Sequence, residues 1–176
     1  MILLIIKGYP GSGKTTLAGK FAKKHDFALI KQDSFWFGLN PGSMISRFTR
    51  SLDRQVGFKN IISCTENYME VQKPILIEGA LLVDVPGEPP IIPAVLSLAA
   101  KYKYDPIIIT LKADDKTRHK RQRKRGYILR PHIDNRLKRA AQKQFADLDQ
   151  AITLDTSCLS IKKSIEALED IILKEA

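Results

Sequence analysis

A glycine-rich stretch near the start of the chain has the residue types and the spacing that bind phosphate. Residues 8–15 read Gly-Tyr-Pro-Gly-Ser-Gly-Lys-Thr and fit the pattern G-x-x-x-x-G-K-S/T at every specified position. In this pattern backbone N–H groups point at phosphate oxygens, Lys14 faces the β- and γ-phosphates of ATP, and the Thr15 hydroxyl coordinates Mg²⁺. We therefore expect the nucleotide to be bound by Gly8, Gly11, Ser12, Gly13, Lys14, Thr15 and Thr16.

Two carboxylates stand where apolar runs of strand length end. Asp33 follows the second run and Glu78 ends the third. Ligands of open α/β sheets bind at the carboxyl ends of the strands, so both side chains should lie near the phosphates. Asp33 could accept the proton of an attacking hydroxyl or help to orient Mg²⁺, and Glu78 could bind Mg²⁺ through water. The alternatives are structural: Asp33 could cap the next helix, and local hydrogen bonds could hold Glu78.

Positive charge is concentrated in one part of the chain. The formal net charge is +10, and the stretch from Lys116 to Arg130 holds eight basic residues and no acidic one. A solvated helix face normally interleaves both signs, so this block predicts contact with a polyanion such as nucleic acid. Arg121 and Arg125 are four residues apart and hence on one helix face, where they could clamp a transferring phosphoryl group.

Two short motifs raise the alternative of a GTPase. Residues 84–87 form a literal D-x-x-G, and residues 111–114 end in the K-x-D of a guanine-recognition motif. Leu111 stands where that motif needs Asn or Thr, and it cannot make their hydrogen bonds. No obvious switch threonine lies between Asp33 and Glu78. The sequence therefore favours a kinase over a GTPase.

The elements that must position these residues alternate along the chain. Strands are expected over residues 2–7, 27–31, 74–82, 105–111 and 151–154. Helices are expected over residues 15–24, 44–71, 94–101, 114–125, 131–147 and 160–174. The last helix should bury one apolar face, formed by Ile161, Ile165, Leu168, Ile172 and Leu173. This alternation predicts the α/β class, with a five-stranded parallel sheet covered by helices on both faces.

The length and composition of the chain limit the number of domains and the class of protein that it can form. A chain of 176 residues with 44% apolar residues is long enough for one domain over 1–176 with a real core. Its longest apolar runs are too short to span a bilayer, and the run over residues 1–6 lacks the basic region of a signal peptide. We therefore expect a cytoplasmic protein. Cys64 and Cys158 have no metal-ligand spacing and should be free thiols.

Several of these residues together resemble a known family. The loop over residues 8–16, Asp33 and the run over residues 120–126 are similar to P-loop kinases of the polynucleotide-kinase and zeta-toxin type. The resemblance implies a parallel five-stranded core with a basic lid over about residues 114–131. It also implies that Asp33 is the general base, that Arg121 and Arg125 are lid arginines, and that residues 155–157, with Thr156, form the adenine-side loop.

Two features on the acceptor side depart from this family. Trp36 stands where a polynucleotide kinase has an arginine, and it could stack on an acceptor ring or lie in the core. Residues 32–35 and 77–82 resemble uridine and nicotinamide riboside kinases instead. We expect Mg·ATP-dependent transfer to a hydroxyl, with nucleic acid as the favoured acceptor and a nucleoside or sugar nucleotide as the alternative. A non-enzymatic nucleotide-regulated module is the least favoured reading.

Overall fold

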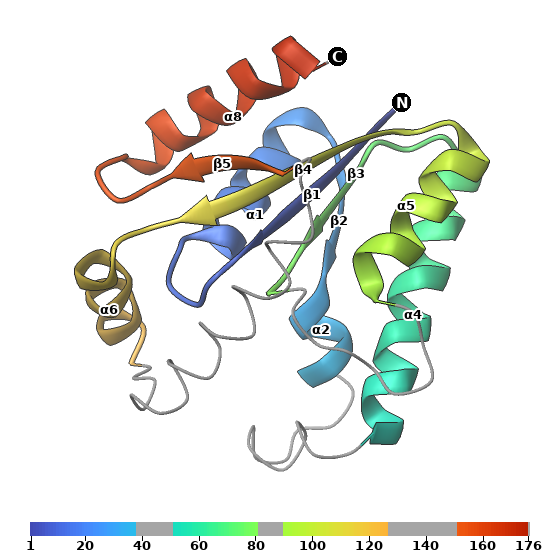
Figure 1. The fold of residues 1–176 in the computed structure, drawn as a ribbon, viewed down its shortest axis with the longest axis horizontal. Helices are drawn as coiled ribbons and strands as arrows, with labels where there is room; N and C mark the ends of the chain where they lie inside the picture. Colours follow the sequence, from blue (N-terminus) through green and yellow to red (C-terminus); the bar gives the residue numbers. More distant parts are fainter. Residues whose placement is uncertain (38–50, 81–89, 127–150, 176) are drawn as a thin grey trace.

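The computed structural model describes residues 1–37, 51–80, 90–126 and 151–175 (Figure 1). Several expectations lie outside these residues. They are the helix over 131–147, the start of the helix over 44–71, the exit of the third strand, the D-x-x-G motif and the lid beyond residue 126. No helix in the described part of the chain is both long enough and apolar enough to cross a membrane. The expected cytoplasmic location stays a prediction.

A single five-stranded sheet runs through the molecule in the order β2-β3-β1-β4-β5, and every pairing in it is parallel. The strands are β1 (Ile2–Gly8), β2 (Ala28–Lys31), β3 (Ile75–Glu78), β4 (Asp105–Lys112) and β5 (Ile152–Asp155). Because all strands run the same way, their carboxyl ends share one edge of the sheet. The predicted fold class is confirmed, and this edge is where a ligand should bind.

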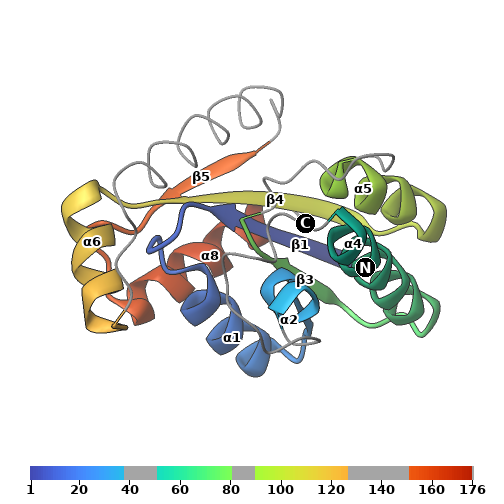
Figure 2. The same ribbon diagram turned by 90° about the horizontal axis from the view of Figure 1, so that it is seen from below.

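The described helices cover both faces of the sheet (Figure 2). They are α1 (Lys14–His25), α2 (Gln32–Phe37), α4 (Ser51–Glu70), α5 (Ile91–Tyr102), α6 (Asp115–Lys124) and α8 (Ile161–Glu175). Helix α5 begins three residues earlier than predicted and includes Pro93 in its first turn. A first-turn residue has no helical partner for its N–H, so proline costs little there.

The central strand β1 is buried on both faces, which explains its unbroken apolar run. Leu3 and Ile5 pack in a cluster with α4 and α5, and Leu4 and Ile6 pack in a second cluster with α1 and α8. All four side chains are at most 1% exposed. Successive side chains of a strand point to opposite faces, so a strand between two helix layers buries both faces and favours the apolar residues seen from Ile2 to Ile6.

Helix α8 buries a slightly different face from the predicted one. Leu168 and Ile172 are buried and Ser164 is buried beside them, but Leu173 is 79% exposed. The prediction for Leu173 was wrong. Each residue of a helix turns about 100° from the one before it, which carries Leu173 off the stripe that Ile172 shares. Ile171 packs partly against the core from the other side.

Two leucines of α8 therefore make a matched test of the core. Leu168→Ala should lower the free energy of unfolding by about 2–5 kcal/mol, because it leaves a cavity under α1 and the sheet. Leu173→Ala should change it by less than about 0.5 kcal/mol. Chemical denaturation of both variants measures the difference, and equal losses would contradict this packing.

Candidate active site

The phosphate-binding loop joins β1 to α1 and depends on glycine backbone geometry. Gly11 and Gly13 have φ angles of 85° and 103°, in the left-handed region that favours glycine. At Gly11 there is also no room for a side chain, because a Cβ atom would lie 2.8 Å from the carbonyl oxygen of Arg118. The loop is thus packed directly against the backbone of α6.

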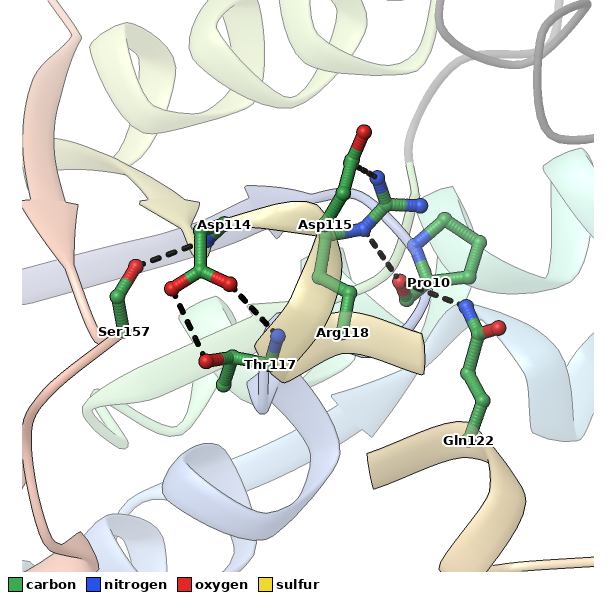
Figure 3. Close-up of polar contacts among 7 residues, drawn as sticks. All are labelled: Pro10, Asp114, Asp115, Thr117, Arg118, Gln122 and Ser157. Atoms are coloured by element: carbon green, nitrogen blue, oxygen red, sulfur yellow. Dashed lines mark hydrogen bonds and ion pairs between the residues drawn. The ribbon is translucent and has the colours of Figure 1, made fainter. Parts of the chain in front are cut away.

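Side chains of α6 hold the outward-facing carbonyl groups of this loop. Arg118 Nε and Gln122 Nε2 both donate to the carbonyl of Pro10, at 3.0 and 3.1 Å (Figure 3). Arg121 Nη1 donates to the carbonyl of Ser12 at 3.1 Å. A loop that turns its N–H groups toward phosphate turns its carbonyls away from it, and those carbonyls need donors. Helix α6 supplies them.

Helix α6 is itself fixed at its start by Asp114. This carboxylate accepts from the backbone N–H of Thr117 at 2.6 Å and from its hydroxyl at 3.0 Å, and these bonds hold the pKa of Asp114 below its usual range. The backbone N–H of Asp114 donates to Ser157 Oγ at 2.8 Å (Figure 3). Asp114 is thus a helix cap, and Leu111 is buried in the sheet. Their arrangement gives no support to guanine recognition.

Thr156 ties the loop after β5 to the phosphate-binding loop. Its buried hydroxyl lies 2.8 Å from the carbonyl of Ser12, to which it can donate, and accepts from Arg121 Nη1 at 3.0 Å. Arg121 Nη2 also donates to the carbonyl of Thr156 at 2.7 Å. The described hydrogen bonds of Arg121 are all with protein oxygens. Its expected contact with a phosphoryl group, and that of Thr156 with the nucleotide, stay predictions.

A cavity of about 440 Å³ opens between the phosphate-binding loop, α6 and the start of α8. Leu111, Leu159 and Ile161 contribute apolar walls, and Arg121, Lys124 and Arg125 contribute positive charge. Arg125 Nη2 donates to Thr16 Oγ1 at 2.8 Å across the cavity. Apolar walls beside a cationic rim suit a flat base with phosphates attached. The cavity has the place and chemistry expected of a nucleotide site.

Lys14 and the two predicted carboxylates come together where the loop enters α1. Glu78 is 3% exposed, and Thr15 Oγ1 donates to Glu78 Oε2 at 3.4 Å. Burial raises the pKa of Glu78, and the positive charge of Lys14 lowers it in part. The nearby carboxylate of Asp33 raises the pKa of Glu78 further. Burial also raises the pKa of Asp33, again opposed by Lys14. Lys14 has its own pKa lowered by burial and raised by both carboxylates, and its Nζ donates to the carbonyl of Tyr9 at 3.1 Å.

Asp33 lies in the first turn of α2, as its second residue. It is therefore not the residue before the helix, as the capping alternative supposed, although a carboxylate here also interacts favourably with the helix dipole. Asp33 as a residue is exposed, although surrounding protein atoms partly desolvate its carboxylate, so an acceptor could reach it. Trp36 belongs to the same helix, but its side chain lies outside the described residues.

The oxygen donors of this cluster fit Mg²⁺. Thr15 Oγ1 and the Glu78 carboxylate already approach each other, and Asp33 acts electrostatically on the same carboxylate. Among the described residues no three acidic, histidine or cysteine side chains gather closely enough to hold a metal by themselves. Mg²⁺ is typically bound by one or two carboxylates together with phosphate oxygens, which agrees with a site completed by ATP.

The residues that support the site were not predicted from the sequence. Arg118 and Gln122 are buried against the loop, and Gln32 is buried at the start of α2. Helical spacing puts Arg118 and Gln122 on the same side of α6 as Arg121 and Arg125, but α6 has no apolar stripe that would show from the sequence that this side is buried. The residues that bond the loop or α1 are 118, 121, 122 and 125, while the exposed cations 116, 120 and 123 lie on the other side.

Comparison with known families and structures agrees with the fold. The family model AAA_33, described as an AAA domain, matches residues 3–153. No protein with a curated description matches the sequence. Three solved structures of similar fold illustrate the range of matches. A sugar kinase from Janibacter sp. HTCC2649 is 18% identical, with a TM-score of 0.62, and the match covers 100% of this chain and 98% of that one.

The other two are also kinases. Shikimate kinase from Bacteroides thetaiotaomicron is 15% identical, with a TM-score of 0.64 and coverage of 97% and 98%. Deoxyadenosine kinase from M. mycoides, with bound dATP, is 14% identical, with a TM-score of 0.59 and coverage of 97% and 99%. At these identities the likeness shows the fold and not the substrate.

Substitutions on the two sides of α6 should have different effects. Arg118→Met keeps the length of the side chain but removes its bond to Pro10, so unfolding should become easier by about 1–3 kcal/mol and the Kd for Mg·ATP should rise several-fold. Lys120→Met, on the exposed side, should change stability by less than about 0.5 kcal/mol. Denaturation and nucleotide titration test both, and similar losses of ATP affinity would refute the support role.

Proposed function

The chain belongs to the AAA_33 family of P-loop kinases, and from this premise we propose that it transfers the γ-phosphoryl group of Mg·ATP to a hydroxyl of a small molecule. The observation that carries this proposal is the cluster of Lys14, Thr15, Asp33 and Glu78 beside the phosphate-binding loop. It combines a cation for the phosphates, oxygen ligands for Mg²⁺ and a carboxylate that can take a proton.

Each residue of the cluster has a distinct part in the proposed reaction. Asp33 accepts the proton of the acceptor hydroxyl. The oxygen of that hydroxyl forms a bond to the γ-phosphorus, and the bond between this phosphorus and the β–γ bridging oxygen breaks. Lys14 and the loop amides hold the phosphates, and Thr15 and Glu78 would hold Mg²⁺. The metal, when bound, neutralises charge on the phosphate oxygens. Arg121 and Arg125 would stabilise the remaining charge from the lid side.

A small acceptor is favoured over nucleic acid because arginines of the basic block already bond to other groups of the protein. Arg118 is buried, 2.7 Å from Asp115 and bonded to the loop, and Arg121 is bonded to loop carbonyls. These charges need no polyanion to explain them. Solved kinases of similar fold also act on small molecules, to judge from the sugar, shikimate and deoxyadenosine kinases. A nucleoside or a sugar derivative is the acceptor class that we propose.

One observation keeps nucleic acid as the second candidate. Lys116, Lys120 and Arg123 are exposed on the side of α6 that faces away from the loop, whereas Lys124 also lines the cavity. None of the three makes an ion pair with another described residue. Three such cations on one side of a helix are suited to a phosphate backbone.

The role of Asp33 can be tested directly. Asp33→Asn should lower kcat by about 10²–10⁴-fold, because the amide cannot accept the proton, while the Kd for Mg·ATP changes little. In the wild type, kcat should fall as the pH falls through the pKa of Asp33, which burial places above the usual value for an aspartate. Steady-state kinetics and nucleotide titration separate the two effects. Loss of Mg·ATP binding without a separate effect on turnover would make Asp33 a metal ligand instead.

The acceptor class is tested by transfer of labelled γ-phosphate from ATP to nucleosides, sugars, sugar nucleotides and oligonucleotides. We expect transfer to a small acceptor with a KM that is nearly indifferent to salt, and none by a folded Lys14→Ala protein. Lys120→Gln with Arg123→Gln, on the outer side of α6, should leave that transfer unchanged.

Nucleic acid would give the opposite pattern. Oligonucleotide affinity would then fall steeply with salt, because bound phosphates release counterions, and the double variant would lower both affinity and salt dependence. Near-normal turnover by Lys14→Ala would defeat the kinase mechanism itself.

A further inference from the structure

There is no room for a side chain at Gly79, because Gln32 fills the adjacent space. Gly79 is not among the glycines with a positive φ, so its backbone does not need glycine. A Cβ atom built on it would lie 2.7 Å from Gln32 Cβ and 3.1 Å from Gln32 Cδ, and would also overlap Oε1. Real Cβ atoms essentially never approach other atoms as closely as the first distance. Gln32 is fully buried and cannot swing into solvent without opening this contact.

These two residues sit immediately beside the two carboxylates of the site. In the parallel pairing of β2 and β3, Lys31 lies opposite Glu78 as the last pair, so Gln32 and Gly79 are the residues that directly follow the two strands. Gln32 precedes Asp33 and Gly79 follows Glu78. A shift of α2 away from β3 at this contact therefore moves one carboxylate relative to the other.

The same contact is connected to the phosphate-binding loop. The backbone N–H of Gly79 donates to the carbonyl of Ile6 at 3.2 Å, in the strand that leads into the loop. Lys14, at the end of that loop, acts electrostatically on both Asp33 and Glu78. Three chain segments that carry the proposed catalytic groups thus meet around Gly79.

We propose that the close fit of Gln32 over Gly79 sets the spacing of Asp33 and Glu78, and that Gln32 is a positioning residue for the phosphoryl transfer. The inference rests on the proposed function for its catalytic consequence, but the fit itself is a property of the folded chain. Misplacing a catalytic group by about 1 Å can cost about 10²-fold in rate, so a contact of this kind has a measurable effect.

The test adds a side-chain carbon at position 79 and then removes the side chain at position 32. Gly79→Ala adds a Cβ that must displace Gln32, and it should lower kcat by about 10–100-fold. The KM for ATP should change less, because Gln32, Glu78 and Gly79 are not among the residues that line the nucleotide cavity. Gln32→Gly with Gly79→Ala removes the obstructing atoms and should recover most of that loss. Gly19→Ala is the matched control, since a Cβ at Gly19 in α1 meets no atom within 4 Å, and it should leave kcat unchanged.

A second measurement does not depend on turnover. Amide hydrogen exchange in the first turn of α2 and at Gly79, read without nucleotide, should be faster in Gly79→Ala, restored in the double variant and unchanged in Gly19→Ala. If the wild type transfers no phosphate to any acceptor, the proposed function fails while the exchange data still decide whether the fit exists.

Two results would overturn the inference. One is a Gly79→Ala protein with wild-type kcat and wild-type exchange. The other is a double variant that is no better than Gly79→Ala alone, since a steric contact must be relieved when its obstructing side chain is removed. If Gly79→Ala does not fold, Gln32→Gly alone takes its place. It causes no overlap and should still lower kcat, with the KM for ATP unchanged, and a wild-type kcat would then count against the positioning role.

Discussion

The constraint on which the site depends is the need of the phosphate-binding loop to satisfy its own carbonyl groups. A loop whose N–H groups face phosphate presents its carbonyl oxygens outward, and unpartnered carbonyls in a packed region are costly. Helix α6 meets this need with Arg118 and Gln122 on Pro10 and with Arg121 on Ser12. The cap at Asp114 fixes where α6 begins, so loop, helix and β4 form one unit.

This arrangement changes the meaning of the positive charge. In the sequence, the basic block over residues 116–130 contains no acidic residue, and it therefore suggested a surface for nucleic acid. In three dimensions α6 has two sides with different tasks: Arg118 and Arg121 donate to the loop, while Lys120 and Arg123 remain in solvent. Only the outer side is available to a partner, which is why the block is weaker evidence for a polyanion than its composition suggests.

The parallel sheet explains how residues distant in sequence reach one place. Lys14, Asp33 and Glu78 each follow or end a different strand, and all three strands finish at the same edge. Burial there works against the charged forms of all three groups, and the ammonium and the two carboxylates partly offset that cost for one another. A site of this kind holds charge in low-dielectric surroundings, where it acts more strongly on phosphate than it would in water.

The sequence by itself determined the class of fold, the phosphate-binding loop and the candidate roles of Lys14, Thr15, Asp33 and Glu78. Those features depend on local patterns: apolar runs buried on both faces, and a motif whose spacing is fixed by the ligand. Tertiary structure alone decided which side of α6 meets the loop, because a helix without an apolar stripe carries no signal of its buried side. It also decided that Gly79 makes room for Gln32. That fit depends on the distance between two segments, and a single strand or helix does not encode that distance. The exposure of Leu173, in contrast, follows from helical geometry and could have been predicted from the sequence.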